Sequence, residues 1–237
     1  MPASLLTKEF GHLIRRIGVR GWAGYGLAAV LFTYVVPARY GLDFLDVYFM
    51  LAYACLPSLF VSPMVADSVL EWRSTAESDA AGPGNLYIAQ VLAAAVFAWL
   101  WGVVVLSGGI AVVNLTGRAM GTLLPPAPIL INAIALGLAL TLASAAVVGL
   151  LALNSKTARE AKGFARRGFL LLLLGVVMWA RMGPAGAKQS VEERLSSGRI
   201  SMFVLPVSAV FLVLGLAAMR SGARRKEEES EGPLFKL

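Results

Sequence analysis

Six long runs of apolar residues alternate with shorter polar segments along the chain. A helix needs about 20 apolar residues to cross the hydrocarbon core of a bilayer, and most of these runs reach that length. The pattern predicts an all-α polytopic membrane protein with a single transmembrane domain over residues 1–220. A charge-rich tail without a core, residues 221–237, is expected to be disordered. The expected spans are approximately residues 21–37, 43–63, 86–112, 129–153, 164–182 and 201–220.

The segment before the first span, residues 4–20, has the pattern of a basic amphipathic helix. Apolar residues recur on one helical face, and the other face is charged and includes Arg15 and Arg16. Such a helix lies in the membrane interface, where apolar side chains enter the lipid and basic ones meet anionic headgroups. We therefore expect an interfacial helix with Arg15 and Arg16 on the lipid surface, hinged to the first span at Gly18 and Gly21.

The composition agrees with a membrane protein, since 58% of the residues are hydrophobic and only 15% are charged. The net charge of +7 does not indicate nucleic-acid binding, because most Lys and Arg residues flank the apolar runs. With the N-terminus placed inside, 15 of the 21 basic residues fall in inner segments. The positive-inside rule then predicts that both termini lie in the cytoplasm.

The fourth span carries a stripe of small residues at intervals of four. Small residues let another helix approach closely, which is the usual basis of helix packing in lipid. The pattern predicts a packing face, either within this chain or across a dimer. Its members are Ala133, Gly137, Thr141, Ala145 and Gly149.

The polar segment 65–85, after the second span, is the one inner segment with a net negative charge, because it has four acidic residues and one Arg. Ser68 and Glu71 have the spacing of a capping box, which predicts the start of a separate amphipathic helix. Gly82-Pro83-Gly84 then predicts a turn. The helix is interpreted either as a handle for a soluble partner or as a solvated loop helix on the lipid surface.

The inner segment 154–168, after the fourth span, is strongly basic, with five Lys or Arg residues and one acid. Thr157 and Glu160 have the spacing of a second capping box. The polar segment 183–200, before the last span, is long enough for one or two short helices.

The sequence lacks the motifs of several enzymes and carriers. It has no G-x-x-x-x-G-K-[ST] for ATP binding and no H-E-x-x-H for zinc, and its only Cys and His are Cys55 and His12. No ionisable residue lies near the middle of an expected span, whereas ion-driven carriers need such groups. We therefore expect neither an enzyme nor a metal site nor a hydrophilic pore, and an energy source outside this chain.

Two further groups allow more than one interpretation. Asp43 and Asp46, one turn apart before the second span, could bind a cation, although such pairs are usually hydrated at the interface. Phe97, Trp99 and Trp101 in the third span could line an apolar path or serve as packing.

The layout of these segments resembles the permease subunits of ATP-binding-cassette exporters of the second permease type, whose fold is called type V. LLTKEFGHLIRRIGVR is similar to that family's basic helix before span 1, and VADSVLEWRSTAESDAAGPGNLYIAQVLA to its acidic cytosolic helix after span 2. The basic turn LLALNSKTAREAKGFARRG and the external segment 183–200 also match in placement. The family's usual Gly-Thr-Leu is replaced here by Ser74-Thr75-Ala76.

The resemblance implies a permease subunit that exports an apolar or amphipathic substrate. It implies a homodimer or heterodimer of permease subunits and a separate cytoplasmic ATPase, which would hold the ATP and Mg²⁺, so that this chain has no cofactor. The alternative is a non-transporting structural or assembly subunit of a membrane complex. The residues implied in docking the ATPase are Asp67, Glu71, Trp72, Arg73, Glu77, Lys156 and Arg159.

Overall fold

The chain folds into a bundle of long helices in a computed structural model. The structure describes residues 3–75, 83–116, 123–155 and 187–231. It also describes twelve residues between these last two ranges, namely 157, 159, 160, 163, 164, 167, 168, 170, 171, 174, 175 and 178. All regular elements in these residues are helical, and five helical segments are long and apolar enough to cross a membrane. The chain is therefore an all-α membrane protein.

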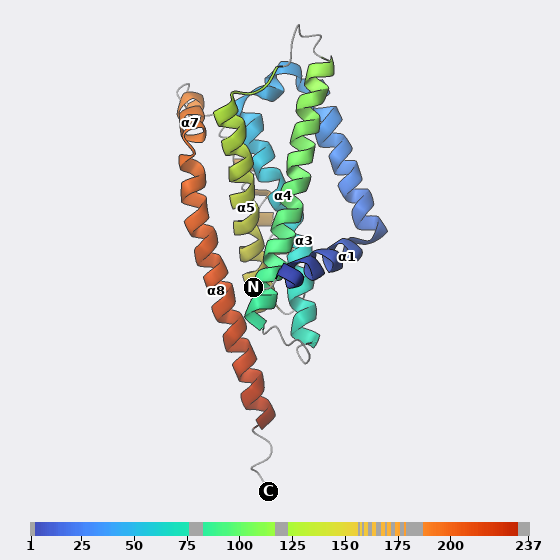
Figure 1. Cartoon of the computed structure of the whole chain (residues 1–237), viewed down its shortest axis with the longest axis vertical. Coiled ribbons are helices and arrows are strands. Elements are labelled where there is room, and N and C mark those ends of the chain that lie inside the picture. Colours follow the sequence, from blue (N-terminus) through green and yellow to red (C-terminus); the bar gives the residue numbers. More distant parts are fainter. Residues whose placement is uncertain are drawn as a thin grey trace.

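Helix α1 (Ala3–Val30) is divided by a kink at Gly18. The backbone of Gly18 has φ 62° and ψ 171°, in a region that side chains rarely adopt, so glycine allows the break. The part before the kink crosses the lower end of the bundle, and the part after it rises along the bundle (Figure 1). The hinge predicted at Gly18 is confirmed, whereas Gly21 keeps helical geometry.

The first span continues beyond its predicted end at Pro37. A π-helical turn, η1 (Leu31–Val35), leads into α2 (Val36–Tyr40) and then into a 3₁₀ helix, η2 (Gly41–Leu45). The backbone of Val35 and Val36 is helical, so Pro37 lies inside a run of helical residues and does not end it. Prolines are tolerated inside membrane helices because local π or 3₁₀ adjustments satisfy the freed carbonyls, and the π-helical turn before Pro37 is such an adjustment.

Helix α3 (Val47–Thr75) merges the predicted second span with the beginning of the acidic segment. Pro57 and Pro63 both lie inside it, although Pro63 was expected to end the span. Prolines are tolerated in membrane helices because neighbouring groups satisfy the freed carbonyls. The acidic segment therefore begins as the continuation of a span and not as a separate helix.

The predicted capping box at Ser68 and Glu71 is wrong. The Ser68 hydroxyl donates to the carbonyl of Met64 at 3.0 Å, a bond of the helix interior, in place of capping a new N-terminus. The residues just before it, Val65 and Ala66, are fully buried in the bundle. Their packing favours continuation of α3 through the serine.

Helices α4 (Pro83–Thr116) and α5 (Ala127–Asn154) are antiparallel neighbours. Pro83 starts α4, as expected of proline in a first turn. Asn114, in the last turn of α4, donates to the carbonyl of Leu123 at 2.9 Å and accepts from the N–H of the same residue at 2.6 Å. These two hydrogen bonds hold the end of α4 against the segment that leads into α5.

The C-terminal part consists of α7 (Ala187–Ser196) and α8 (Arg199–Glu231), joined by a turn at Gly198. The expected disordered tail differs from the structure over residues 221–231, where α8 continues. Arg, Lys and Glu are good helix formers, and basic and acidic residues there are spaced four apart. Residues 232–237 lie outside the described residues, as does most of the predicted span 164–182.

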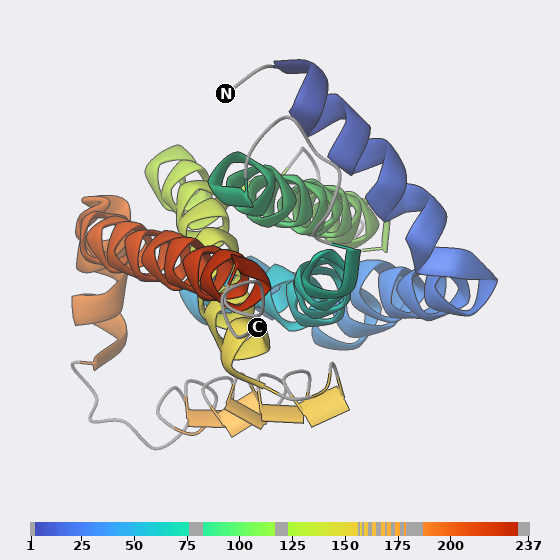
Figure 2. The same ribbon diagram turned by 90° about the horizontal axis from the view of Figure 1, so that it is seen from below.

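The interior of the bundle is apolar. One cluster of buried residues occupies the lower end and joins α3, α4 and α5, with α1 at its edge. A second cluster occupies the upper end and includes Leu195 of α7. Seen from below, α8 crosses in front of α5, and the first part of α1 lies on the outside (Figure 2). The described core therefore consists of α3, α4 and α5, with α1 and α8 at the periphery.

Candidate docking end of the bundle

The end of α3 provides most of the residues expected to dock a partner. Val65, Ala66 and Val69 are fully buried, so α3 is held by the bundle at the level where its acidic residues begin. Asp67 lies at the same level and is half-buried. Glu71, Trp72 and Arg73 belong to the last two turns of α3. Glu77 lies outside the described residues.

The end of α5 lies at the same end of the bundle as the end of α3 (Figure 1). Ser155 is extended, with φ −93° and ψ 150°, and Thr157 follows it. The backbone N–H of Glu160 donates to the Thr157 hydroxyl at 3.3 Å, which is the N-cap half of the predicted capping box. Arg159 is exposed beside this cap, and Lys156 lies outside the described residues.

The first part of α1 packs onto the beginning of α4. Leu5 is buried against Leu86 and Ala89, and Phe10 meets Phe97 edge-to-face with ring centroids 5.9 Å apart. The side of this helix that carries Lys8, His12 and Arg15 is exposed. Arg15 is therefore free of the bundle, and Arg16 lies beside it on α1. The apolar face predicted to enter lipid is partly covered by protein.

The aromatic residues of the third span take part in packing. Phe97 and Trp101 belong to a network with Tyr25, and the rings of Phe97 and Trp101 lie 6.1 Å and 5.9 Å from that of Tyr25. The indole N–H of Trp99 donates to the carbonyl of Ile134 on α5 at 2.9 Å. These contacts favour the packing interpretation over a lining for an apolar path.

The small-residue stripe of α5, from Ala133 to Gly149, is buried along its whole length. A side chain at Gly137 would meet the backbone of Ala54 on α3 at 3.5 Å, and one at Gly149 would meet the Tyr87 hydroxyl on α4 at 2.7 Å. Between them, the Thr141 hydroxyl donates to the carbonyl of Gly137 at 2.8 Å, and Ala145 is fully buried. The sequence left a dimer contact open, and in the structure helices of the same chain fill this face.

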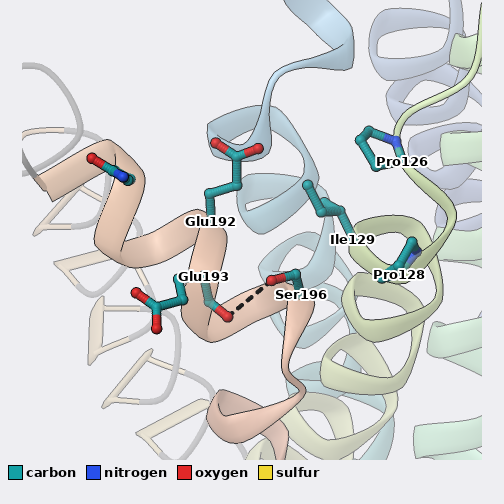
Figure 3. A pocket seen from close by; sticks show the side chains of 7 residues that line it. Pro126, Pro128, Ile129, Glu192, Glu193 and Ser196 are labelled. Carbon is teal, nitrogen blue, oxygen red and sulfur yellow. Dashed lines mark hydrogen bonds between the residues drawn. The ribbon is translucent and has the colours of Figure 1, made fainter.

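The opposite end of the bundle has an open pocket of about 410 Å³ between α5 and α7 (Figure 3). Pro126, Pro128 and Ile129 form its apolar side, the exposed Glu192 lies beside it, and the exposed carboxylate of Glu193 points away from it (Figure 3). Nothing in the sequence predicts this pocket, because the acidic pair lies in a short polar segment with no motif. The lining residues are Pro126, Pro128, Ile129, Gln189, Glu192, Glu193 and Ser196.

The pair Asp43 and Asp46 also lies at this upper end. Asp43 is exposed, while Asp46 precedes α3 and its carbonyl accepts from the N–H groups of Phe49 and Met50. The described residues contain no group of three His, Cys, Asp or Glu side chains that could hold a metal ion. The pair therefore does not form a metal centre with other described residues.

Comparison of the chain with protein-family models, with curated proteins and with solved structures gives no match.

Proposed function

We propose that the chain is the membrane-spanning permease subunit of an ATP-binding-cassette exporter in the bacterial inner membrane, with both termini in the cytoplasm. It would act as a homodimer or heterodimer with separate ATPase subunits. The observation that carries the proposal is the continuity of α3, which joins the most buried span to the acidic residues at its end.

Helix α3 is long enough to transmit a force from its end into the core of the bundle. Its 29 residues correspond to about 43 Å at 1.5 Å per residue, against roughly 30 Å for the hydrocarbon core of a bilayer. The apolar part is Val47–Val69, so the last turns with Glu71 and Arg73 project beyond it. A force on these turns would be transmitted into the core without an intervening loop. Movement of α3 and of the 154–168 turn would then open a path outward.

The substrate class follows from the chemistry of the interior. The buried polar side chains of the described spans are uncharged hydroxyl and amide groups, such as Thr141, Ser144 and Gln90. A charged or strongly hydrated solute would find no groups in this interior that could replace its hydration shell. The proposal therefore specifies an apolar or amphipathic substrate, with energy from ATP bound by the partner.

Charge reversal at the end of α3 tests the docking role. The variant Glu71→Lys with Glu77→Lys is expressed in the native cell and purified from its membrane in parallel with the unmodified protein, and co-purification of a cassette ATPase and the ATPase activity of the preparation are measured. Both should be lost, because like charges would then oppose a partner selected for an acidic helix. The matched control, Glu192→Lys with Glu193→Lys, makes the same change at the opposite end (Figure 3) and should leave both unchanged. Retention of both activities by the α3 variant would contradict the proposal.

A non-transporting structural subunit is the second candidate, and the filled interior of the bundle favours it. Large side chains such as Phe44, Met50 and Leu136 are completely buried at the upper end. Co-purification from the native membrane separates the two candidates. An ATPase partner supports the permease, whereas a stable assembly without any ATPase supports the structural subunit.

A further inference from the structure

The first part of α1 is held on α4 above the lower limit of the apolar part of that helix. Leu5 shares a buried cluster with Ala89, and the ring of Phe10 meets that of Phe97. The apolar part of α4 begins at Gly84. At 1.5 Å per residue, Ala89 and Phe97 lie about 8 Å and about 20 Å above this limit. Protein contacts therefore place the first part of α1 at a level where α4 is apolar.

The side of this helix that faces away from the bundle is basic. Lys8, His12 and Arg15 follow one another at intervals of four and three residues, so they share one helical face, and all three are exposed. Glu9 lies beside this face and is only partly exposed. Charged side chains in contact with acyl chains are strongly unfavourable. The outward side of the helix therefore needs polar neighbours at this level.

The flank of the bundle formed by α8 is apolar at the same level, on the other side of α4 from α1 (Figure 2). Gly215 of α8 lies against the ring of Tyr87 on α4, because a Cβ on this glycine would collide with the ring. Val213 and Leu214 precede this glycine and are 62% and 48% exposed. Exposed side chains of this kind suit acyl chains, which are as apolar as leucine. One height in the bundle is thus basic on the α1 flank and apolar on the α8 flank.

We propose that anionic phospholipids of the leaflet at the lower end of the bundle bind along the outward face of α1, with their phosphates on Lys8 and Arg15. Ammonium and guanidinium groups both bind phosphate, and a guanidinium can do so through two parallel hydrogen bonds. Two bases without an acid on the same face favour a headgroup of net negative charge over a zwitterionic one.

Trp22 supports a headgroup level at this height. It lies just beyond the kink of α1, it is 44% exposed, and its ring is 5.9 Å from that of Phe97. Tryptophan favours the level of the headgroups, where its ring meets both chains and polar groups. The membrane surface therefore lies higher beside α1 than beside α8. This inference concerns the lipid around the chain and does not depend on the proposed transport.

Native mass spectrometry of the full-length protein tests the headgroup preference. The protein is released from micelles that hold phosphatidylglycerol and phosphatidylcholine in equal amounts, and the lipids that remain bound are counted. We expect severalfold more phosphatidylglycerol than phosphatidylcholine. Lys8→Gln with Arg15→Gln should remove this preference. The matched control, Arg194→Gln with Arg199→Gln, neutralises two exposed bases at the upper end and should keep it.

Spin labels in vesicles of the same two lipids test the difference in height. Cys55→Ala removes the native thiol, and one nitroxide is placed at His12→Cys on α1 or at Val213→Cys on α8. The first label should be reached by a water-soluble nickel complex, and the second by oxygen dissolved in the acyl chains. The inference is overturned if the unmodified protein retains both lipids equally, if the α1 variant keeps the preference, or if the control loses it. It is also overturned if the two labels report the same depth.

Discussion

Helices α3 and α8 have similar lengths but opposite relations to the bundle. Both project past their apolar parts at the lower end (Figure 1). In an 18-residue apolar stretch of α3, 69% of the residues are buried, against 12% in the corresponding stretch of α8. The first is enclosed by neighbours from the same chain, and the second presents most of its surface outward.

The difference lies in the side chains that make the contacts. Helix α3 is held by large residues such as Met50, Val61 and Val65, which are completely buried. The buried positions of α8 are Ser201, Ser208 and Gly215, and its large side chains that pack against the core, such as Val204 and Leu212, are only partly buried. A large side chain that is enclosed on every side contributes more packing than one that touches the core on one side only. The difference in burial thus identifies α3 as a central helix of the bundle and α8 as a peripheral one.

The largest expected effect is on the contact between α3 and α4. A side chain at Gly102 would collide with the ring of Pro57, so Gly102→Leu should destabilise the bundle by about 1–3 kcal/mol. Unfolding by sodium dodecyl sulfate in mixed micelles measures it. Gly26→Leu is the matched control, because a Cβ there meets no atom within 4 Å. Equal stability of the two variants would show that α3 is not tightly enclosed.

A smaller effect is expected when one valine in each helix is replaced by alanine, which removes two methyl groups. Val61→Ala on α3 should lower the free energy of unfolding by about 1 kcal/mol. In a micelle the exposed side chain meets detergent tails and not water, so only the cost of the cavity left in the bundle remains. Val210→Ala on α8, where the side chain is 57% exposed, should change stability by less than about 0.5 kcal/mol. The same unfolding assay compares the two. A larger loss of stability at Val210 than at Val61 would contradict the assignment of α3 as the central helix and α8 as the peripheral one.

The smallest expected effect is at the contact between α8 and α5. Ser208→Ala removes the hydrogen bond to the carbonyl of Ala139, and interhelical hydrogen bonds in membranes average about 0.6 kcal/mol. Because the hydroxyl can donate its one proton either to Ala139 or to Val204, the loss of stability should not exceed that value. A double-mutant comparison with Tyr87→Phe, which removes the hydroxyl that donates to Ala146 of α5, measures the coupling in the unfolding assay. A loss of several times this size would show that α8 is not a peripheral helix.

The sequence predicts the helices well and their ends poorly. Apolar density gives each described span, and the spacing of small residues gives the packing face of α5. Pro37 and Pro63 suggest ends that the structure does not have, because a local stop signal competes with tertiary packing of the residues around it.

The two predicted capping boxes show why the docking end was only partly predictable. Thr157 follows an extended residue, Ser155, and its hydroxyl accepts from a backbone N–H as a cap must. Ser68 has the same spacing to its glutamate but follows buried helical residues, and its hydroxyl donates backwards. An N-cap needs a non-helical chain before it, and the spacing of the motif carries no information on that condition.

The two hydrogen bonds between Asn114 and Leu123 make the connection between α4 and α5 a closed ring. The side-chain amide of Asn114 fixes both ends of this connection. The relative position of α4 and α5 therefore does not depend on the number of residues between Asn114 and Leu123. Doubling the length of a closed loop costs only about 0.6 kcal/mol. The connection is therefore the natural place to insert an epitope, and antibody access to it would report which side of the membrane this end of the bundle faces.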